Sequence, residues 1–281
     1  MKRNRVVVLM VLGALAAAGM VLAAAPSGAA LVVVKCYGEP ITLPVGTLMG
    51  TAGNDVMMGT AGDDVMEGLG GADTICGGGG DDTIYGGGGA DSLRGDGGDD
   101  TIYGGAGWDE IRGDAGHDVL RGQGNCDWLQ GGDGNDVLFP GAGGAACAGT
   151  AEGGSGRDRF VIDAESDNDL FGGLGVDTAD FRRAPVGMVV DLETGHYDSV
   201  AAPPIGSLVF QTESVFGSAF ADTITGDARR NHLLGFGGDD VLNGGNGDDY
   251  LDGGADSDTL DGGGGTDTCL AWEVSGANCE N

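Results

Sequence analysis

A nine-residue repeat runs through most of the chain and limits its fold more than any other feature. From Gly50 to Gly131 every ninth residue is glycine, and another glycine follows three residues later in nine of the ten units. The sixth position is always aspartate, from Asp55 to Asp136, and the eighth is always large and aliphatic, from Met57 to Leu138. A disordered acidic tail would not keep a large aliphatic residue at the same position of every unit. The register therefore predicts an ordered stack of short repeated units.

A second array of six units runs from Gly217 to the unit that begins at Gly262. Its unit at Gly226 is degenerate, because Arg229 and Asn231 stand where glycine and aspartate belong. Two isolated units, GGSGRDRFV and GGLGVDTAD, lie between the arrays. The pattern predicts two repeat blocks joined by an irregular segment that contains strands.

The repeat by itself does not explain what holds such a chain in order. Burying one aliphatic side chain per unit stabilises it by about 1.5–3 kcal/mol, whereas fixing the backbone costs about 1–2 kcal/mol for each residue. Stacking also lines up aspartates about 4.8 Å apart, where their charges repel. The net charge of −31 argues against nucleic acid and anionic membranes as partners, and it favours a cation.

The units match the pattern G-G-x-G-x-D-x-U-x and so resemble the calcium-binding repeat of RTX (hemolysin-type) proteins. The resemblance implies an all-β fold, a parallel β-roll or right-handed β-solenoid. In this fold six residues of each unit turn around Ca²⁺, three form a strand, and two units make one coil. Loops n and n+2 would share an ion through aspartate carboxylates and loop carbonyls. The implied metal ligands are Asp55, Asp64, Asp73, Asp82, Asp91, Asp100, Asp109, Asp118, Asp127, Asp136, Asp158, Asp177, Asp222, Asp240, Asp249, Asp258 and Asp267.

Calcium chemistry suits these residues. Ca²⁺ takes six to eight oxygen ligands, and a site that exists only in the folded stack turns binding energy into folding energy. Ions between loops n and n+2 would number about twelve over the two arrays. We expect the chain to leave the cell unfolded and to fold on meeting external Ca²⁺.

The first thirty residues have the layout of a secretory signal peptide. Basic residues from Lys2 to Arg5 precede an apolar run, and small residues follow it before Leu31. The alternative is an uncleaved membrane anchor, because about 20 apolar residues span a bilayer. The small residues favour cleavage, which predicts a secreted, extracellular protein with no membrane contact after cleavage.

Six cysteines in an oxidising compartment suggest three disulfides, for which fifteen pairings are possible. Proximity favours Cys269 with Cys279 and Cys126 with Cys147, which leaves Cys36 with Cys76. No spacing of cysteine and histidine indicates a zinc site.

The chain is expected to divide into six parts. These are a signal peptide (1–30), an N-terminal cap (31–49), a first roll of ten nonapeptides (50–139), an interrupted spacer with two isolated repeats (140–216), a second roll of six nonapeptides (217–270) and a C-terminal cap (271–281). Within the spacer, the stretch VGMVVDL predicts a strand. A bond from Cys269 to Cys279 would fold the last residues over the open end, with Trp272 as apolar cover.

No catalytic motif is found. The three histidines lie far apart, HExxH is absent, and no serine sits in a nucleophile elbow, so we expect no enzyme. We expect a free-standing calcium-binding protein, or alternatively a structural or adhesive surface module that binds a cell-surface protein or glycan. The candidate surface for such a partner is the row Tyr85, Tyr103 and Arg121, although ladder packing between neighbouring strands explains the same row.

Overall fold

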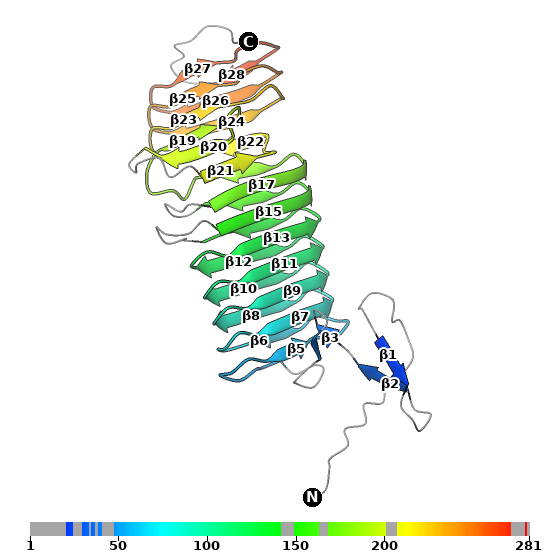
Figure 1. The fold of residues 1–281 in the computed structure, drawn as a ribbon. Helices are drawn as coiled ribbons and strands as arrows, with labels where there is room; N and C mark the ends of the chain where they lie inside the picture. The colour runs from blue at the N-terminus through cyan, green and yellow to red at the C-terminus, as the bar shows by residue number, and fades with distance from the viewer. Residues whose placement is uncertain are drawn as a thin grey trace, which may run out of the picture.

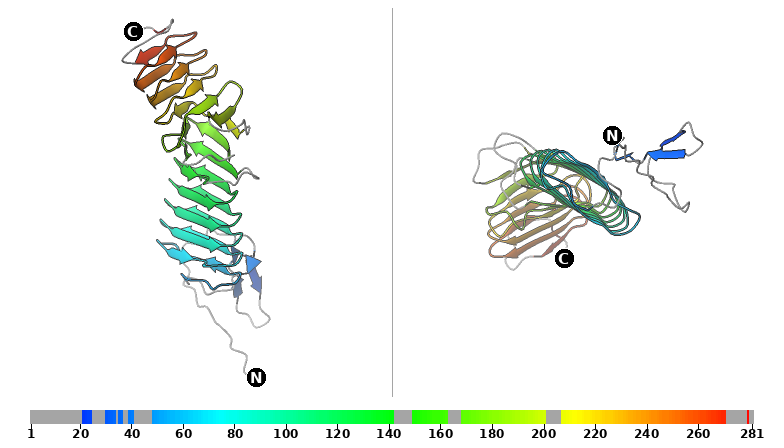
Figure 2. Two further views of the ribbon diagram at one scale, coloured as in Figure 1. Left: turned by 90° about the vertical axis from the view of Figure 1, so that its left-hand side faces the viewer. Right: turned by 90° about the horizontal axis from the view of Figure 1, so that it is seen from below.

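The computed structural model describes residues 21–24, 30–33, 35–36, 39–40, 48–141, 149–162, 168–200, 207–270 and 279. Short strands from residue 48 to residue 270 wind into a long rod, with one strand of each coil in each of two facing sheets (Figures 1 and 2). The described residues contain no helix. The predicted all-β parallel β-roll is confirmed.

One sheet, here called the even sheet, has 11 strands that all pair in parallel. From the N-terminal end its strands are β6 (Val65–Glu67), β8 (Thr83–Gly88), β10 (Thr101–Ala106), β12 (Val119–Gly124), β14 (Val137–Phe139), β16 (Arg159–Val161), β18 (Thr178–Asp180), β22 (Ser214–Phe216), β24 (His232–Gly237), β26 (Tyr250–Ala255) and β28 (Thr268–Leu270).

The facing sheet, here called the odd sheet, has 13 strands. In order they are β5 (Val56–Met58), β7 (Thr74–Gly79), β9 (Ser92–Gly97), β11 (Glu110–Ala115), β13 (Trp128–Asp133), β15 (Gly149–Gly156), β17 (Asn168–Gly175), β21 (Ser207–Phe210), β20 (His196–Ser199), β19 (Met188–Asp191), β23 (Thr223–Thr225), β25 (Val241–Asn243) and β27 (Thr259–Asp261). All pairs are parallel except β19 with β20 and β20 with β21.

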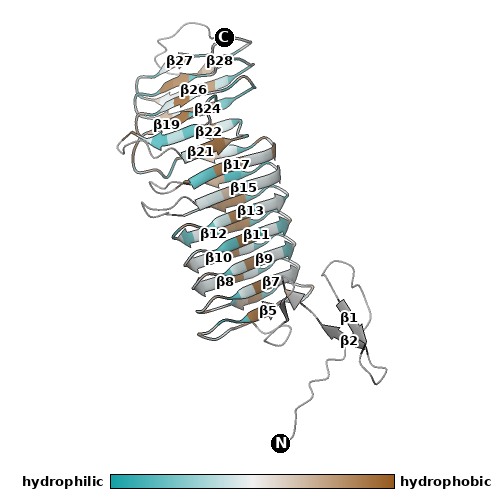
Figure 3. Cartoon of the chain, in the orientation of Figure 1, coloured by the Kyte–Doolittle hydropathy of each residue, from teal (hydrophilic) through white to brown (hydrophobic). Residues whose placement is uncertain are grey.

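The register shows why two units make one coil. Tyr103 pairs with Tyr85 on one side and with Arg121 on the other, so partners in the repeat blocks are 18 residues apart. A nine-residue unit therefore alternates between the two sheets, and its eighth residue points into the narrow space between them. The aliphatic column from Met57 to Leu138 is fully buried, which gives the rod its apolar stripe (Figure 3).

The spacer continues the roll rather than separating two rolls. Strands β16, β18 and β22 are rungs of the even sheet, and Phe160, Ala179 and Val215 extend the same buried column. The predicted strand in VGMVVDL is β19, which returns to the odd sheet through the β20–β21 pair. Residues with irregular sequence thus keep the two-sheet core intact between the repeat blocks.

Cross-links secure both ends of the rod. Cys36, in β3 (Lys35–Cys36), is bonded to Cys76 and buried against it and Met58, and β3 pairs with β4 (Glu39–Pro40). Cys269 is bonded to Cys279. Both pairings agree with the predicted ones.

Some predictions fall on residues that the structure does not describe. Cys126 is disulfide-bonded, but Cys147 and Trp272 lie outside the described residues. The same is true of most of the predicted signal peptide, from which residues 21–24 form β1 (Val21–Ala24) and pair antiparallel with β2 (Ala30–Val33). Within the described segments, no helix has the length and apolar character needed to cross a bilayer.

Candidate metal centre

The loops that connect the sheets turn through two left-handed backbone positions. In the unit that begins at Gly104, the second and fourth residues, Gly105 and Gly107, have φ of 113° and 142°. A side chain at the fourth position would overlap the carbonyl of Gly89, one coil earlier. Glycine is therefore favoured there because neighbouring loops stack closely through their backbones, and Asn125 and Asp256 are the residues that replace it with positive φ.

The sixth-position aspartates form two rows, one along each side of the rod. In each row, Oδ1 of one aspartate accepts a hydrogen bond from the backbone N–H of the aspartate one coil earlier. Asp82 N donates to Asp100 Oδ1 at 2.7 Å, and Asp100 N donates to Asp118 Oδ1 at 2.8 Å. The predicted site residues are thus brought together in rows, and one carboxylate oxygen of each is used to join successive coils.

The second carboxylate oxygen has no partner in most loops. Oδ2 is buried and accepts no hydrogen bond in Asp73, Asp82, Asp91, Asp100, Asp109, Asp118, Asp127, Asp136, Asp158, Asp177, Asp240, Asp249 and Asp258. A buried carboxylate oxygen without a donor or a cation is costly. Because the same oxygen lacks a hydrogen-bond donor in loop after loop along both rows, the arrangement indicates a ligand-binding site and not a local error in packing.

The space beside each of these oxygens is lined by oxygens. A Cβ added to Gly86 would lie 2.6 Å from Asp91 Oδ2 and 2.5 Å from the carbonyl oxygen of Gly104 in the next coil. A carboxylate and a carbonyl from neighbouring coils therefore converge above the first glycine of the unit. Oxygen donors of these two kinds suit a hard cation such as Ca²⁺. In the described part of the chain, no three His, Cys, Asp or Glu side chains are grouped as a metal site, so backbone oxygens would complete the shell.

Comparison with known proteins decides the family. The family model of the RTX calcium-binding nonapeptide repeat matches residues 49–84, 85–120, 120–144, 216–251 and 234–269, which together are more than half of the chain. The chain belongs to the RTX calcium-binding repeat family. A search of curated proteins found no match. RTX repeats bind Ca²⁺, and they are typical of secreted proteins and of structural rather than catalytic domains.

Without a cation, the RTX carboxyls are held in an unfavourable setting. Burial raises the pKa of Asp100, Asp118 and Asp127 to about 7, and repulsion from aspartates in neighbouring coils adds to the effect for all three. The hydrogen bond from the preceding coil lowers each pKa but does not offset burial. A bound cation would reverse this, because it favours the ionised carboxylate.

Four RTX loops depart from this arrangement, those that begin at Gly50, Gly59, Gly217 and Gly226. None of their residues has positive φ. Asp64 Oδ2 accepts hydrogen bonds from Thr60 N at 2.6 Å and from Thr60 Oγ1 at 2.8 Å, so the oxygen that is unpartnered elsewhere is satisfied within its own loop. The predicted ligands Asp55, Asp64 and Asp222 therefore differ in their surroundings from the others.

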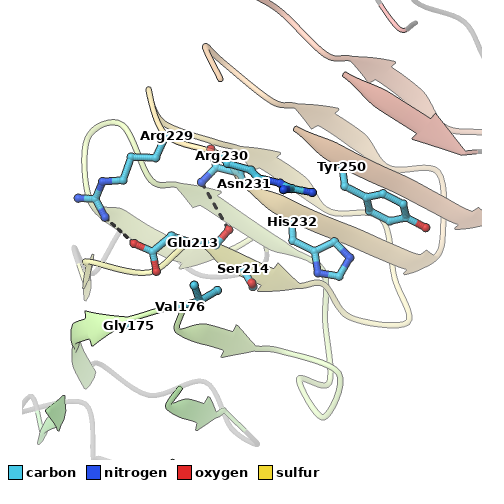
Figure 4. Close-up of a pocket in the computed structure, with 9 residues that line it drawn as sticks. All are labelled: Gly175, Val176, Glu213, Ser214, Arg229, Arg230, Asn231, His232 and Tyr250. Atoms are coloured by element: carbon cyan, nitrogen blue, oxygen red, sulfur yellow. Dashed lines mark hydrogen bonds and ion pairs between the residues drawn. The ribbon is translucent and has the colours of Figure 1, made fainter. Parts of the chain in front are cut away.

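The aspartate row of the even sheet is interrupted at the junction with the second block. Glu213 takes the place of an aspartate, and its Oε2 accepts the backbone N–H of Asp177 at 3.1 Å. Its other oxygen pairs with Arg229 at 2.6 Å, beside an open groove of about 650 Å³ that His232 and Tyr250 also line (Figure 4). Sequence reasoning missed Glu213 because its nine-residue unit, 208–216, contains no glycine and has glutamate in place of aspartate, although Arg229 marked a neighbouring unit as degenerate.

Proposed function

We propose that this protein is an extracellular calcium-binding solenoid that folds when several Ca²⁺ ions bind between its stacked Gly/Asp loops. The observation that carries the proposal is the row of buried, unpartnered Oδ2 atoms on each side of the rod. All of these atoms except Asp258 Oδ2 lie where a carbonyl oxygen of the next coil also points. Of the seventeen aspartates named from the sequence, the fourteen other than Asp55, Asp64 and Asp222 are the proposed ligands, and about twelve ions is the number that the sequence alone predicts.

The residues of the chain have distinct parts in this mechanism. The aspartate Oδ1 atoms join successive coils, while Oδ2 and the loop carbonyls face the proposed ion. When bound, Ca²⁺ supplies positive charge and accepts six to eight oxygens. The glycines keep the space open, since a Cβ on Gly86 would occupy the point where the two oxygens converge.

Folding on binding follows from the charge and the narrow core. The chain carries a net charge of −31, and most units bury only one large side chain. Above neutral pH, buried carboxylates such as Asp100 oppose the metal-free roll, because the folded state raises their pKa values. Export through the predicted signal peptide (1–30) would deliver the chain to a compartment with millimolar Ca²⁺, which suits extracellular modules with affinities of about 10⁻⁴–10⁻³ M.

Catalysis is not part of the proposal, since the RTX roll explains the paired acidic residues as ligands. The alternative function, binding of a cell-surface protein or glycan, rests on the row Tyr85, Tyr103 and Arg121. The rings of Tyr85 and Tyr103 stack at 4.9 Å between centroids, and Arg121 lies 3.8 Å from the ring centroid of Phe139. These side chains already pack against one another along the even sheet, which favours a role in strand packing.

Circular dichroism and calorimetry test the proposal on the full secreted chain. We expect strand signal to appear on addition of Ca²⁺ and to be lost in excess chelator, with binding of many ions per chain. A chain that keeps its strand signal and its protease resistance after exhaustive dialysis against EDTA would contradict it. Magnesium at the same concentration is the control, because Mg²⁺ demands octahedral geometry and keeps its water.

A further inference from the structure

The four exceptional loops share one internal hydrogen-bond pattern. In the loop at Gly50, Thr51 N and Oγ1 lie 2.6 and 2.9 Å from Asp55 Oδ2. In the loop at Gly217, Ser218 N lies 2.6 Å from Asp222 Oδ2, and Ser218 Oγ lies 2.9 Å from its Oδ1. The second residue of the unit thus binds the carboxylate of the sixth, as Thr60 does with Asp64.

The fourth exceptional loop reaches the same result with different residues. Asp227 N donates to Asn231 Oδ1 at 2.8 Å, and Arg229 N donates to Asp227 Oδ1 at 2.8 Å. The sixth residue is an amide here, so it carries no charge to neutralise. A backbone donor of the loop, the N–H of its second residue, again satisfies the oxygen of the sixth residue.

The backbone of these loops explains why the pattern forms. In the loops at Gly50 and Gly59 the second residue is threonine, which is β-branched and strongly disfavours the left-handed conformation that Leu69 or Gly78 adopts at this position of other units. Ser218 and Asp227 are not β-branched, but they too lack positive φ. Without that turn, a side chain at the fourth position no longer overlaps the neighbouring loop. A Cβ added to Gly62 would meet nothing within 4 Å, whereas one on Gly80, at the same position one coil later, would lie 2.6 Å from Gly62 C and from Asp63 N.

The location of the four loops is not random. They precede β5, β6, β23 and β24, so they form the first complete coil of each repeat block, with one loop on each side. A carbonyl oxygen of the next coil still approaches the first glycine of these loops, as Gly68 O does at 2.7 Å from the Cβ position of Gly50. What distinguishes the first coil is therefore that the oxygen of the sixth residue is already hydrogen-bonded within its own loop.

We infer that the first coil of each block holds no calcium, and that its own N–H and O–H donors occupy the place that the cation takes elsewhere. The inference rests on the proposed calcium function. An ion at Asp55, Asp64 or Asp222 would have to displace two hydrogen bonds to the carboxylate. The ion rows begin instead at the second coil, with Asp73 and Asp82 in the first block and Asp240 and Asp249 in the second. The expected total falls from about twelve ions to about eight.

Paired aspartate variants of the full chain test this assignment. We expect D55N/D64N to bind as many Ca²⁺ ions per chain as the unmodified protein, measured by calorimetry and by metal analysis of the dialysed protein. The matched variant D73N/D82N, one coil later, is expected to lose about two ions. Equal losses in the two variants would overturn the inference.

Glycine variants give a second readout that does not depend on counting ions. We expect G62A to keep the thermal midpoint of the calcium-loaded chain, and G80A to lower it, because only Gly80 has positive φ and a blocked Cβ position. Equal destabilisation by the two would contradict the proposed loop conformation. A protein that binds no Ca²⁺ at all would instead refute the proposed function and leave the hydrogen-bonded first coils in place.

Discussion

The substitution Asp100→Asn is expected to have opposite effects with and without calcium. Asp100 is 1% exposed, its Oδ1 accepts the N–H of Asp82, and its Oδ2 has no partner. Asparagine keeps an oxygen for the bond to Asp82 and removes the charge. The metal-free roll should therefore gain stability, while the calcium-loaded roll should lose a ligand.

The magnitude follows from the pKa of Asp100. Burial, with repulsion from neighbouring aspartates, raises this pKa from 3.8 to about 7. One pKa unit corresponds to about 1.4 kcal/mol, so keeping the carboxylate ionised at pH 8 opposes the metal-free roll by up to about 4 kcal/mol. Asparagine removes this penalty. In the presence of calcium the loss of one charged ligand should raise the calcium concentration needed for folding several-fold.

Two measurements at pH 8 test both signs. In EDTA, the concentration of trimethylamine N-oxide that induces strand signal should fall for D100N, because osmolytes favour burial. In excess Ca²⁺ the thermal midpoint of D100N should fall. Asp99→Asn is the matched control, since it removes the same charge from an exposed loop residue whose Oδ1 accepts the N–H of His117. If D100N and D99N behave alike, the buried carboxylates do not govern the calcium response.

Three further predictions concern pH, loop geometry and the spacer. Acid should partly replace calcium. Carboxyls such as Asp118, whose pKa is raised to about 7, oppose the metal-free roll above that pH and cease to do so as they gain protons. The strand signal of the metal-free protein should therefore rise from pH 8 to pH 5, and an unchanged signal would count against the buried aspartate rows. Gly98→Ala should lower the thermal midpoint in Ca²⁺ sharply, because Gly98 has φ of 128° and an added Cβ would overlap the carbonyl of Gly80. Gly97→Ala should leave the midpoint unchanged, because the space around its Cβ position is open, and similar midpoints for the two variants would refute this loop geometry. Asp180→Asn should destabilise the chain by about 1–3 kcal/mol in denaturant titrations at pH 7, because the arginines that hydrogen-bond to Asp180 lower its pKa. This contribution disappears as Asp180 is protonated, so a stability difference that persists well below pH 4 would contradict the ion-pair explanation.

The repeat predicts the roll because its two periods are visible in the sequence. The nine-residue spacing, with the two units per coil that the family resemblance implies, places Ile84 and Ile102 on successive rungs of one sheet, and the structure pairs them directly. The aspartate rows follow from the same register. A chain with one invariant spacing leaves few alternatives for how its units stack.

The path of the spacer could not be predicted in this way, because paired residues in its successive coils are not 18 residues apart. Asp177 lies 36 residues before Glu213, its hydrogen-bond partner in the row, and the β19–β20–β21 excursion fills the difference. Phe160 takes the eighth position of the isolated unit GGSGRDRFV, and Val215 takes it in a stretch that has no glycine. The first-coil loops were missed for another reason. Thr51, Thr60 and Ser218 at the second position were a visible signal, but their hydrogen bonds form in loops that lack the left-handed turn, which the sequence does not show.

A comparison of two rows in the same loops explains why the sixth position is aspartate. In the loops that precede strands of the even sheet, the fifth residues also form a row, in which Asp81 N donates to Asp63 Oδ1 and Asn135 N donates to His117 Nδ1. A carboxylate, an imidazole or an amide serves there, because the row requires only one acceptor. If the sixth position needed only the acceptor that joins coils, it would vary in the same way. It is aspartate in all ten units of the first block, and in the second block the exception is Asn231, in a first-coil loop. The sixth position therefore needs aspartate because of its second, unpartnered oxygen. A divalent cation is the partner that explains this need, because an amide or an imidazole at the sixth position would not bind it as a carboxylate does.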